Sequence, residues 1–193
     1  MLKELIKKNR SYRRFNEYEK VSMNTLKELV NLARLSASAA NIQPLRYILS
    51  NRKKTNKKIF DCITWAKGLK SWDGPQTGNR PTAYIIILKD NNFTHDVNCD
   101  AGISSQSILL GAVEKGLGGC ILASVDKKKL KDDLDISDEY EILYVLAVGK
   151  PNETVKIVKA NKEGDTNYWR DKKDVHYVPK RSINQIIIEQ HED

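Results

Sequence analysis

Arginine side chains gather near the start of the chain, in the stretch KKNRSYRRF over residues 7–15. Arg10, Arg13 and Arg14 surround Ser11 in this stretch. A guanidinium group presents a fixed fork of hydrogen-bond donors, which matches a phosphate or a carboxylate. The spacing therefore indicates an anion site. A solvated basic helix end remains the alternative on these residues alone.

A second polar cluster occurs in the stretch SASAANIQPLRY, where Ser38, Asn41 and Gln43 precede Pro44. Small side chains let a flat ligand approach the backbone, and Asn and Gln amides can pair with the edge of a heterocycle. A helix C-terminus with an Asn cap and a Pro stop explains the same residues without a ligand.

Two further motifs could contact the same ligand. In the stretch GLGGC, Gly118 and Gly119 could turn backbone N–H groups toward it, although a glycine-terminated helix is the simpler interpretation. The motif is not the GxGxxG fingerprint of a dinucleotide site. In the stretch VPKRSI, Lys180 and Arg181 are either an exposed basic pair or a second cationic clamp on the anion of Arg10.

Metal and thiol chemistry are not supported by the sequence. The chain has three cysteines and no CxxC motif, which supports neither a zinc knuckle nor a disulfide framework and favours a reducing cytoplasm. His95, Asp96, Cys99 and Asp100 lie close together, but their spacing matches no metal-ligand pattern. We therefore predict no bound metal.

Helical and strand patterns intermix along the chain. Ser22 is a candidate N-cap for the first helix, and an apolar β-branched run marks the most buried strand. The patterns predict helices over 22–35, 100–117 and 126–134, and strands over 47–50, 83–88, 120–122 and 142–148. Such a mixture predicts an α+β or α/β fold with a buried sheet under helices.

Two regions do not fit these patterns. Residues 67–81 are rich in Gly and Pro and read as a long loop, of a kind that is often a functional lid. Residues 150–193 lack a large apolar core of their own but end in an isoleucine-rich patch. We expect one domain over residues 1–193, with 150–193 as a C-terminal arm that packs either on its own domain or on a partner subunit.

The composition bounds the possible partners. The formal net charge is +8, which motivates a nucleic-acid partner as one alternative. The lysines are scattered, however, and no RNA- or DNA-binding signature is present, so we expect no nucleic acid. No apolar run is long enough to cross a bilayer, so we expect no membrane contact and a cytoplasmic location.

The order of the motifs is more specific than any one of them. RSYRRF, SASAANIQP, RPTAYIIIL, DAGISSQSILLGAVEKGLGGCIL, VLAVGKP and VPKRSINQII follow one another along the chain. In this order they resemble the FMN-dependent nitroreductase family over nearly the whole sequence. The resemblance implies an α+β sandwich with a central, mostly antiparallel sheet flanked by helices. It also implies a homodimer with FMN bound at the interface.

The resemblance also implies a role for each candidate residue. Arg10 and Ser11 would hold the phosphate and ribityl chain, and Arg13 would lie near the pyrimidine end of the flavin. Ser38, Asn41 and Gln43 would line the isoalloxazine. The glycine turn and the C-terminal basic pair would contact the ring and the phosphate; they are Gly118, Gly119, Lys180 and Arg181.

The implied chemistry belongs to the cofactor. NADH or NADPH would donate a hydride to flavin N5, and a small acceptor such as a nitroaromatic or a quinone would then receive the electrons. No side chain is needed as a catalytic group. Arg13 would stabilise the negative charge of the reduced flavin electrostatically.

Two features depart from the family pattern. Leu45 stands where the family often has Trp, and the loop 67–81 has no general family counterpart, so this loop is where we expect substrate choice to be set. The alternatives to an oxidoreductase are a flavin-binding protein with little turnover and a basic nucleic-acid-binding protein. A flavin spectrum separates the last of these from the other two.

Overall fold

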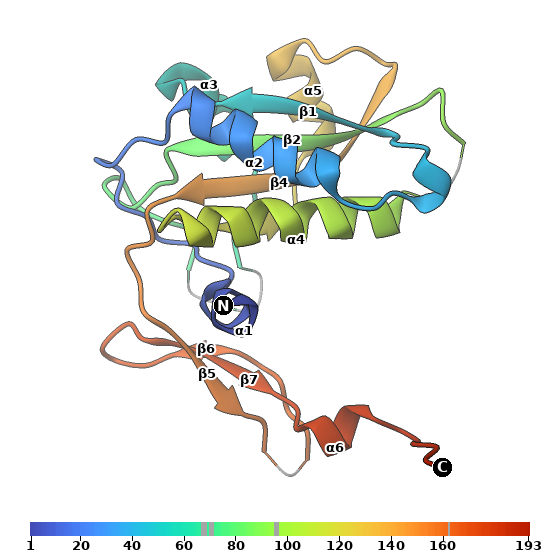
Figure 1. Ribbon diagram of the computed structural model, residues 1–193. Helices are drawn as coiled ribbons and strands as arrows, with labels where there is room; N and C mark the ends of the chain where they lie inside the picture. The colour runs from blue at the N-terminus through green and yellow to red at the C-terminus, as the bar shows by residue number, and fades with distance from the viewer. Residues whose placement is uncertain (67–68, 70–71, 95–96, 162) are drawn as a thin grey trace. The chain divides into compact units, whose positions relative to one another are not determined.

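The computed structural model describes residues 1–66, 69, 72–94, 97–161 and 163–193. The chain forms two compact units (Figure 1). Unit 1 consists of residues 1–65 and 73–152, and unit 2 of residues 66–72 and 153–193. Unit 2 therefore contains nearly all of the segment expected to form a C-terminal arm.

Unit 1 is built on a four-stranded sheet in the order β1-β2-β4-β3, with antiparallel neighbours throughout. The strands are β1 (Leu45–Ser50), β2 (Ala83–Asp90), β3 (Gly118–Leu122) and β4 (Tyr140–Gly149). Each contains the strand expected from the sequence and extends beyond it. The prediction of an α+β fold with an antiparallel sheet is confirmed.

Helices cover this sheet. They are α1 (Leu2–Lys8), α2 (Met23–Leu35), α3 (Lys53–Phe60), α4 (Asn98–Glu114) and α5 (Lys127–Leu134), with a 3-10 turn over Ala39–Asn41. The expected N-cap is confirmed, because the Ser22 side chain accepts a hydrogen bond from the backbone N–H of Thr25 at 3.0 Å. The α1 and α3 helices are short and strongly charged, and the sequence patterns did not indicate them.

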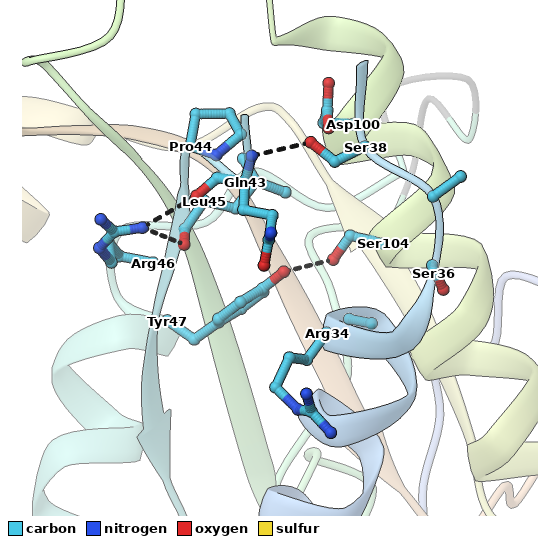
Figure 2. A pocket seen from close by; sticks show the side chains of 12 residues that line it. Arg34, Ser36, Ser38, Gln43, Pro44, Leu45, Arg46, Tyr47, Asp100 and Ser104 are labelled. Atoms are coloured by element: carbon cyan, nitrogen blue, oxygen red, sulfur yellow. Dashed lines mark hydrogen bonds between the residues drawn. The ribbon is translucent and has the colours of Figure 1, made fainter. Parts of the chain in front are cut away.

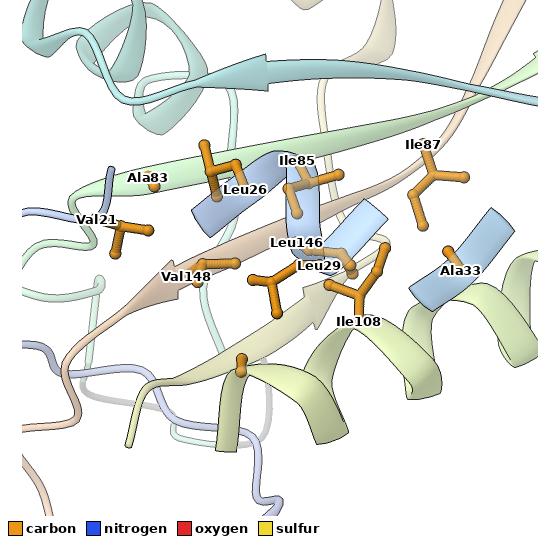
Figure 3. Close-up of a cluster of buried hydrophobic side chains, with 11 residues drawn as sticks. Val21, Leu26, Leu29, Ala33, Ala83, Ile85, Ile87, Ile108, Leu146 and Val148 are labelled. Atoms are coloured by element: carbon orange, nitrogen blue, oxygen red, sulfur yellow. The ribbon is translucent and has the colours of Figure 1, made fainter. Parts of the chain in front are cut away.

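The main core lies between the sheet and two helices. Leu26 and Leu29 of α2 and Ile108 of α4 are buried against β2 and β4 (Figure 3). The cluster comprises Val21, Leu26, Leu29, Ala33, Ala83, Ile85, Ile87, Ile108, Ala112, Leu146 and Val148. α3 packs on β2 and against α5, on the other side of the sheet (Figure 1).

The α4 helix is apolar on two faces. Ile108 and Ala112 enter the core, whereas Ile103, Leu110 and Val113 lie on a face where they stay partly exposed. α1 packs on α4, and Gln106, on the same face as Ile103 and Leu110, bonds to Asn9. This outer face of α4 is therefore covered in part and keeps some apolar surface exposed.

A glycine ends α4, as the sequence alternative for GLGGC anticipated. The N–H of Leu117 bonds to the carbonyl of Ala112 at 2.8 Å, and Gly116 takes the left-handed φ of 70° that this C-terminal motif requires. Gly118 and Gly119 do not belong to the helix end. They are the first two residues of β3.

Unit 2 has a three-stranded sheet in the order β5-β7-β6, in which β5 and β7 are parallel. Its elements are β5 (Val155–Lys159), β6 (Trp169–Arg170), β7 (His176–Lys180) and α6 (Ile183–Ile186). Its buried residues include an ion pair, with Arg170 Nη2 2.8 Å from Glu153 Oε2, and His176, whose ring stacks on that of Tyr168. The isoleucines at its end are exposed.

Candidate functional site

The arginine-rich segment lies along β3. Ser11 forms a parallel bridge with Gly119, and the N–H of Tyr12 donates to the carbonyl of Gly119 at 3.0 Å. A Cβ at Gly119 would come within 2.4 Å of the Ala147 carbonyl oxygen, and one at Gly118 within 2.5 Å of the Tyr12 ring. The two glycines thus allow the close packing that positions the arginine segment.

Arg10 has donor capacity to spare. Its Nη2 donates to the carbonyl of Ile6 at 2.8 Å, but its Nε is buried and meets no hydrogen-bond acceptor in the described part of the chain. Burial lowers the pKa of this guanidinium. A buried N–H without a partner is costly, and an anion would satisfy it. Ser11, next to it, is exposed.

Arg13 lies beside the same segment. Its Nη1 donates to the carbonyl of Ser11 at 3.2 Å, which ties the side chain to the strand-like backbone. The sequence-predicted residues Arg10, Ser11 and Arg13 are thus brought together with Gly118 and Gly119 at one edge of unit 1.

The second predicted cluster has an unusual backbone. Ala40, Asn41 and Gln43 all have left-handed φ values, of 47°, 56° and 53°. Residues other than glycine rarely adopt this conformation, and such strain concentrates at functional sites. Ser38 Oγ accepts from the N–H of Gln43 at 2.9 Å, and Gln43 Nε2 donates to Asn41 Oδ1 at 3.0 Å. Ser38, Asn41 and Gln43 therefore form one turn.

A cavity of about 240 Å³ lies beneath this turn (Figure 2). The hydroxyls of Tyr47 and Ser104 meet across it at 2.9 Å. Burial, with a smaller contribution from the negative charge of Asp100, raises the pKa of Tyr47. The lining residues are Ala33, Arg34, Ser36, Ala37, Ser38, Gln43, Pro44, Leu45, Arg46, Tyr47, Asp100 and Ser104.

Leu45, which replaces a frequent Trp of the family pattern, lines this cavity and packs partly buried against the main core. The sequence patterns singled out neither Tyr47 nor Ser104. The one hint in the sequence is the residue type, because Tyr47 brings a phenol to a largely apolar strand and Ser104 a hydroxyl to a helix.

The two clusters lie on different faces of α4. On one face, Asp100 accepts from the N–H of Ala39 and Ser107 bonds to Ser36, so this face contacts the region of the turn. Gln106 bonds to Asn9 of the arginine side. Residues seven apart share a helix face, whereas residues six apart do not. One chain therefore presents its two candidate clusters in different directions.

Lys180 and Arg181 belong to unit 2, where Lys180 ends β7 and both side chains are exposed. Their proposed role on the phosphate remains a prediction.

The loop over residues 67–81 is described only in part, because 67, 68, 70 and 71 lie outside the described residues. Its later half is anchored to unit 1. Gly74 lies against the Trp65 ring, and Glu17 Oε2 accepts from the N–H of Gly78 at 2.6 Å. Its proposed role in substrate choice remains untested.

The structure also bears on the metal question. His95 and Asp96 lie outside the described residues. In the rest of the chain, no group of three or more His, Cys, Asp or Glu side chains is arranged to hold a metal ion. No helix of the described ranges is long and apolar enough to span a bilayer.

Comparison with known proteins identifies the class. A sequence model of the Nitroreductase family matches residues 6–150, which is most of the chain. The chain therefore belongs to the Nitroreductase family. This membership supports a flavin-dependent oxidoreductase as the general class of activity. No curated protein matches the chain.

Solved structures share the fold. A nitroreductase family protein from Clostridium novyi NT is 18% identical, covers 96% of this chain and 98% of its own, and has a TM-score of 0.65. An FMN-dependent nitroreductase from Clostridium difficile R20291 is 21% identical, with coverage of 87% and 97% and a TM-score of 0.61. Iodotyrosine deiodinase bound to FMN and 3-iodo-L-tyrosine is 19% identical, with coverage of 84% and 96% and a TM-score of 0.68.

Proposed function

We propose that this protein is an FMN-dependent oxidoreductase that takes electrons from NADH or NADPH and passes them to a small acceptor, such as a nitroaromatic or a quinone. The observation that carries the proposal is the buried Arg10 Nε without an acceptor in the described chain, beside the exposed Ser11. Family membership and FMN-containing proteins of the same fold support the choice of anion.

The residues present fit this cofactor. Arg10 and Ser11 would bind its phosphate and ribityl chain with a charged donor and a hydroxyl. Asn41 and Gln43 carry amides that can pair with the edge of the isoalloxazine, and both are exposed on the strained turn. Lys180 and Arg181 would add charge at the phosphate.

When bound, FMN would supply the two-electron chemistry, so no nucleophile or general base is required of the protein. The chain's own residues would orient the cofactor and set its electrostatics. Arg13, held by the Ser11 carbonyl, would provide positive charge at the pyrimidine end.

We further propose a homodimer in which each chain contributes one cluster to each flavin. The supporting observations are the two clusters on different faces of α4 and the partly exposed apolar side chains of Ile103, Leu110 and Val113. The exposed isoleucines at the end of unit 2 support a C-terminal arm that packs on the partner. Three free cysteines support a cytoplasmic location.

Flavin binding is tested first, by the absorption spectrum of the purified protein and by titration with FMN. Arg10→Ala should weaken FMN binding by about 1.5–3 kcal/mol, the usual loss for a hydrogen bond to a charged group. Lys8→Ala removes an exposed cation two residues away and serves as the control. If Arg10→Ala binds FMN as tightly as the wild-type protein, Arg10 does not hold the phosphate.

Turnover is tested next, with NADH and NADPH oxidation in the presence of a panel of acceptors. Oxidation that depends on the acceptor supports the oxidoreductase. A flavin-loaded protein that oxidises neither nucleotide would instead be a flavin-binding protein with little turnover. A colourless protein that binds no added FMN would contradict both.

A further inference from the structure

The turn over residues 38–43 holds a conformation that its sequence does not favour. Ala40, Asn41 and Gln43 are left-handed although none of them is glycine. An isolated segment with these residues would sample other conformations, so surrounding contacts must select this one. The contacts within the turn, from Ser38 to Gln43 and from Gln43 to Asn41, move with it and cannot fix its place on the protein.

Two contacts join the region to α4. The hydroxyls of Ser36 and Ser107 lie 2.7 Å apart, just before the turn. Asp100 Oδ1 accepts from the N–H of Ala39 at 3.3 Å, directly before the first left-handed residue. Asp100 is therefore the side chain that holds the start of the turn itself.

Asp100 is buried, and the burial of its carboxylate calls for an explanation. Its exposed fraction is 5%, although carboxylates are seldom buried without compensation. The first turn of α4 offers some compensation through the helix dipole, but an exposed carboxylate would serve that purpose equally well. Burial is explained if the carboxylate must reach the backbone of a neighbouring segment. Figure 2 shows Asp100 beside Ser38 at the edge of the cavity.

We infer that Asp100 is a positioning residue, which holds the turn over residues 38–43 in its left-handed conformation before any ligand binds. Asn41 and Gln43 are then already presented when the ligand arrives. A preformed site binds more tightly because less conformational entropy is lost on binding. The identity of this ligand as FMN rests on the proposed function. The inference that the turn is preformed does not depend on it.

Three variants test the inference. Asp100→Ala removes the acceptor for the Ala39 N–H. Asp100→Asn keeps an acceptor oxygen of similar reach and removes only the charge. Glu114→Ala removes an exposed carboxylate from the other end of the same helix and is the matched control.

The first measurement is amide hydrogen exchange over residues 39–43 without added FMN. Exchange should become about tenfold faster in Asp100→Ala, as expected for one lost hydrogen bond, and should stay near its original rate in Asp100→Asn and Glu114→Ala. The second measurement is FMN affinity, which should fall about tenfold in Asp100→Ala and recover in Asp100→Asn.

Two results of these measurements would overturn the inference about Asp100. Unchanged exchange over residues 39–43 in Asp100→Ala overturns the inference. So does a loss of protection throughout α4 that Asp100→Asn fails to restore, because Asp100 would then serve the helix and not the turn. If the unchanged protein binds no FMN, the proposed function fails, whereas the exchange measurement still decides the role of Asp100.

Discussion

At the scale of single residues, the proposed site combines two arginines whose side chains are held by backbone carbonyls. Arg10 uses one nitrogen on the carbonyl of Ile6 and keeps a buried Nε without an acceptor in the described chain. Arg13 is tied to the Ser11 carbonyl. The proposed function gives binding to Arg10 and electrostatic tuning to Arg13, so the two roles can be separated by mutation.

Arg13→Gln should lower the midpoint potential of bound FMN. Glutamine keeps a donor and much of the length but removes the positive charge that favours the reduced cofactor. We expect a fall of roughly 20–50 mV, the size of one partly screened charge interaction, and slower reduction by NADH or NADPH. Spectroelectrochemical titration measures the potential.

Arg14→Gln provides the comparison, because Arg14 is the neighbouring arginine of the same segment. FMN affinity should fall less in Arg13→Gln than in Arg10→Ala. If the potential moves in Arg14→Gln and not in Arg13→Gln, the two roles must be exchanged.

At the scale of elements, α4 organises the site. Its N-terminal turn holds the strained segment through Asp100, its middle carries Gln106 against Asn9, and its buried face completes the core. The strained segment is therefore supported by a long, well-packed helix. This support allows three left-handed residues to persist where no glycine is present.

Replacing Ala40 with glycine should relieve part of this strain. Ala40→Gly removes a left-handed Cβ penalty of about 1–2 kcal/mol, partly offset by the greater freedom of glycine in the unfolded chain. Ala39 is its exposed neighbour with an ordinary φ, so Ala39→Gly should be destabilising by about 0.5–1 kcal/mol. Chemical denaturation measures both.

The strain at position 40 is measured by the difference in the free energy of unfolding between the two variants. A free energy of unfolding that falls equally in Ala40→Gly and Ala39→Gly would show that position 40 carries no strain.

Much of this architecture could be predicted from the sequence. The strand AYIIIL and the helix capped by Ser22 follow from local patterns, because apolar periodicity and capping are local properties. The α1 and α3 helices were missed because their charged, weakly apolar sequences carry little periodic signal. The grouping of Arg10, Ser11, Gly118 and Gly119 followed from family order and is now explained by packing on β3.

Other features depend on long-range contacts and could not be predicted. The left-handed turn results from Asp100, sixty-one positions away from Ala39. No local rule places three such residues in a glycine-free segment. In the sheet of unit 2, β5 pairs in parallel with β7 although β6 lies between them in the sequence. Patterns within single segments do not reveal such a pairing.

At the scale of the whole molecule, both units expose apolar side chains. In unit 1 the exposed ones include Ile6 of α1 and Leu35 of α2, while Leu110 on the outer face of α4 is partly exposed. In unit 2 they include the isoleucines at and after α6. Large exposed apolar groups of this kind are typical of surfaces that contact another chain. They motivate the proposed homodimer more directly than the size or charge of the chain.

A charge on the outer face of α4 should weaken the dimer. Leu110→Lys would bury an unpaired ammonium at the interface, so the dissociation constant should rise at least tenfold, or by about 1.4 kcal/mol. Sedimentation velocity at several concentrations measures it. FMN occupancy should fall in parallel.

Tyr18→Lys makes the same kind of change at a side chain that is 86% exposed, and should leave the assembly unaltered. A Leu110→Lys protein that remains a flavin-loaded dimer would place the interface elsewhere.

The parallel bridge between Ser11 and Gly119 has a consequence beyond ligand binding. β3 is the last strand of its sheet, so its outer backbone groups would otherwise be open to strands from other molecules. The arginine segment covers part of this edge through the bond from Tyr12 to Gly119, and its charges disfavour the pairing of a further strand there. The stretch of chain proposed to hold the cofactor thus also protects the protein against edge-to-edge aggregation, and shortening the N-terminus should cost solubility as well as flavin.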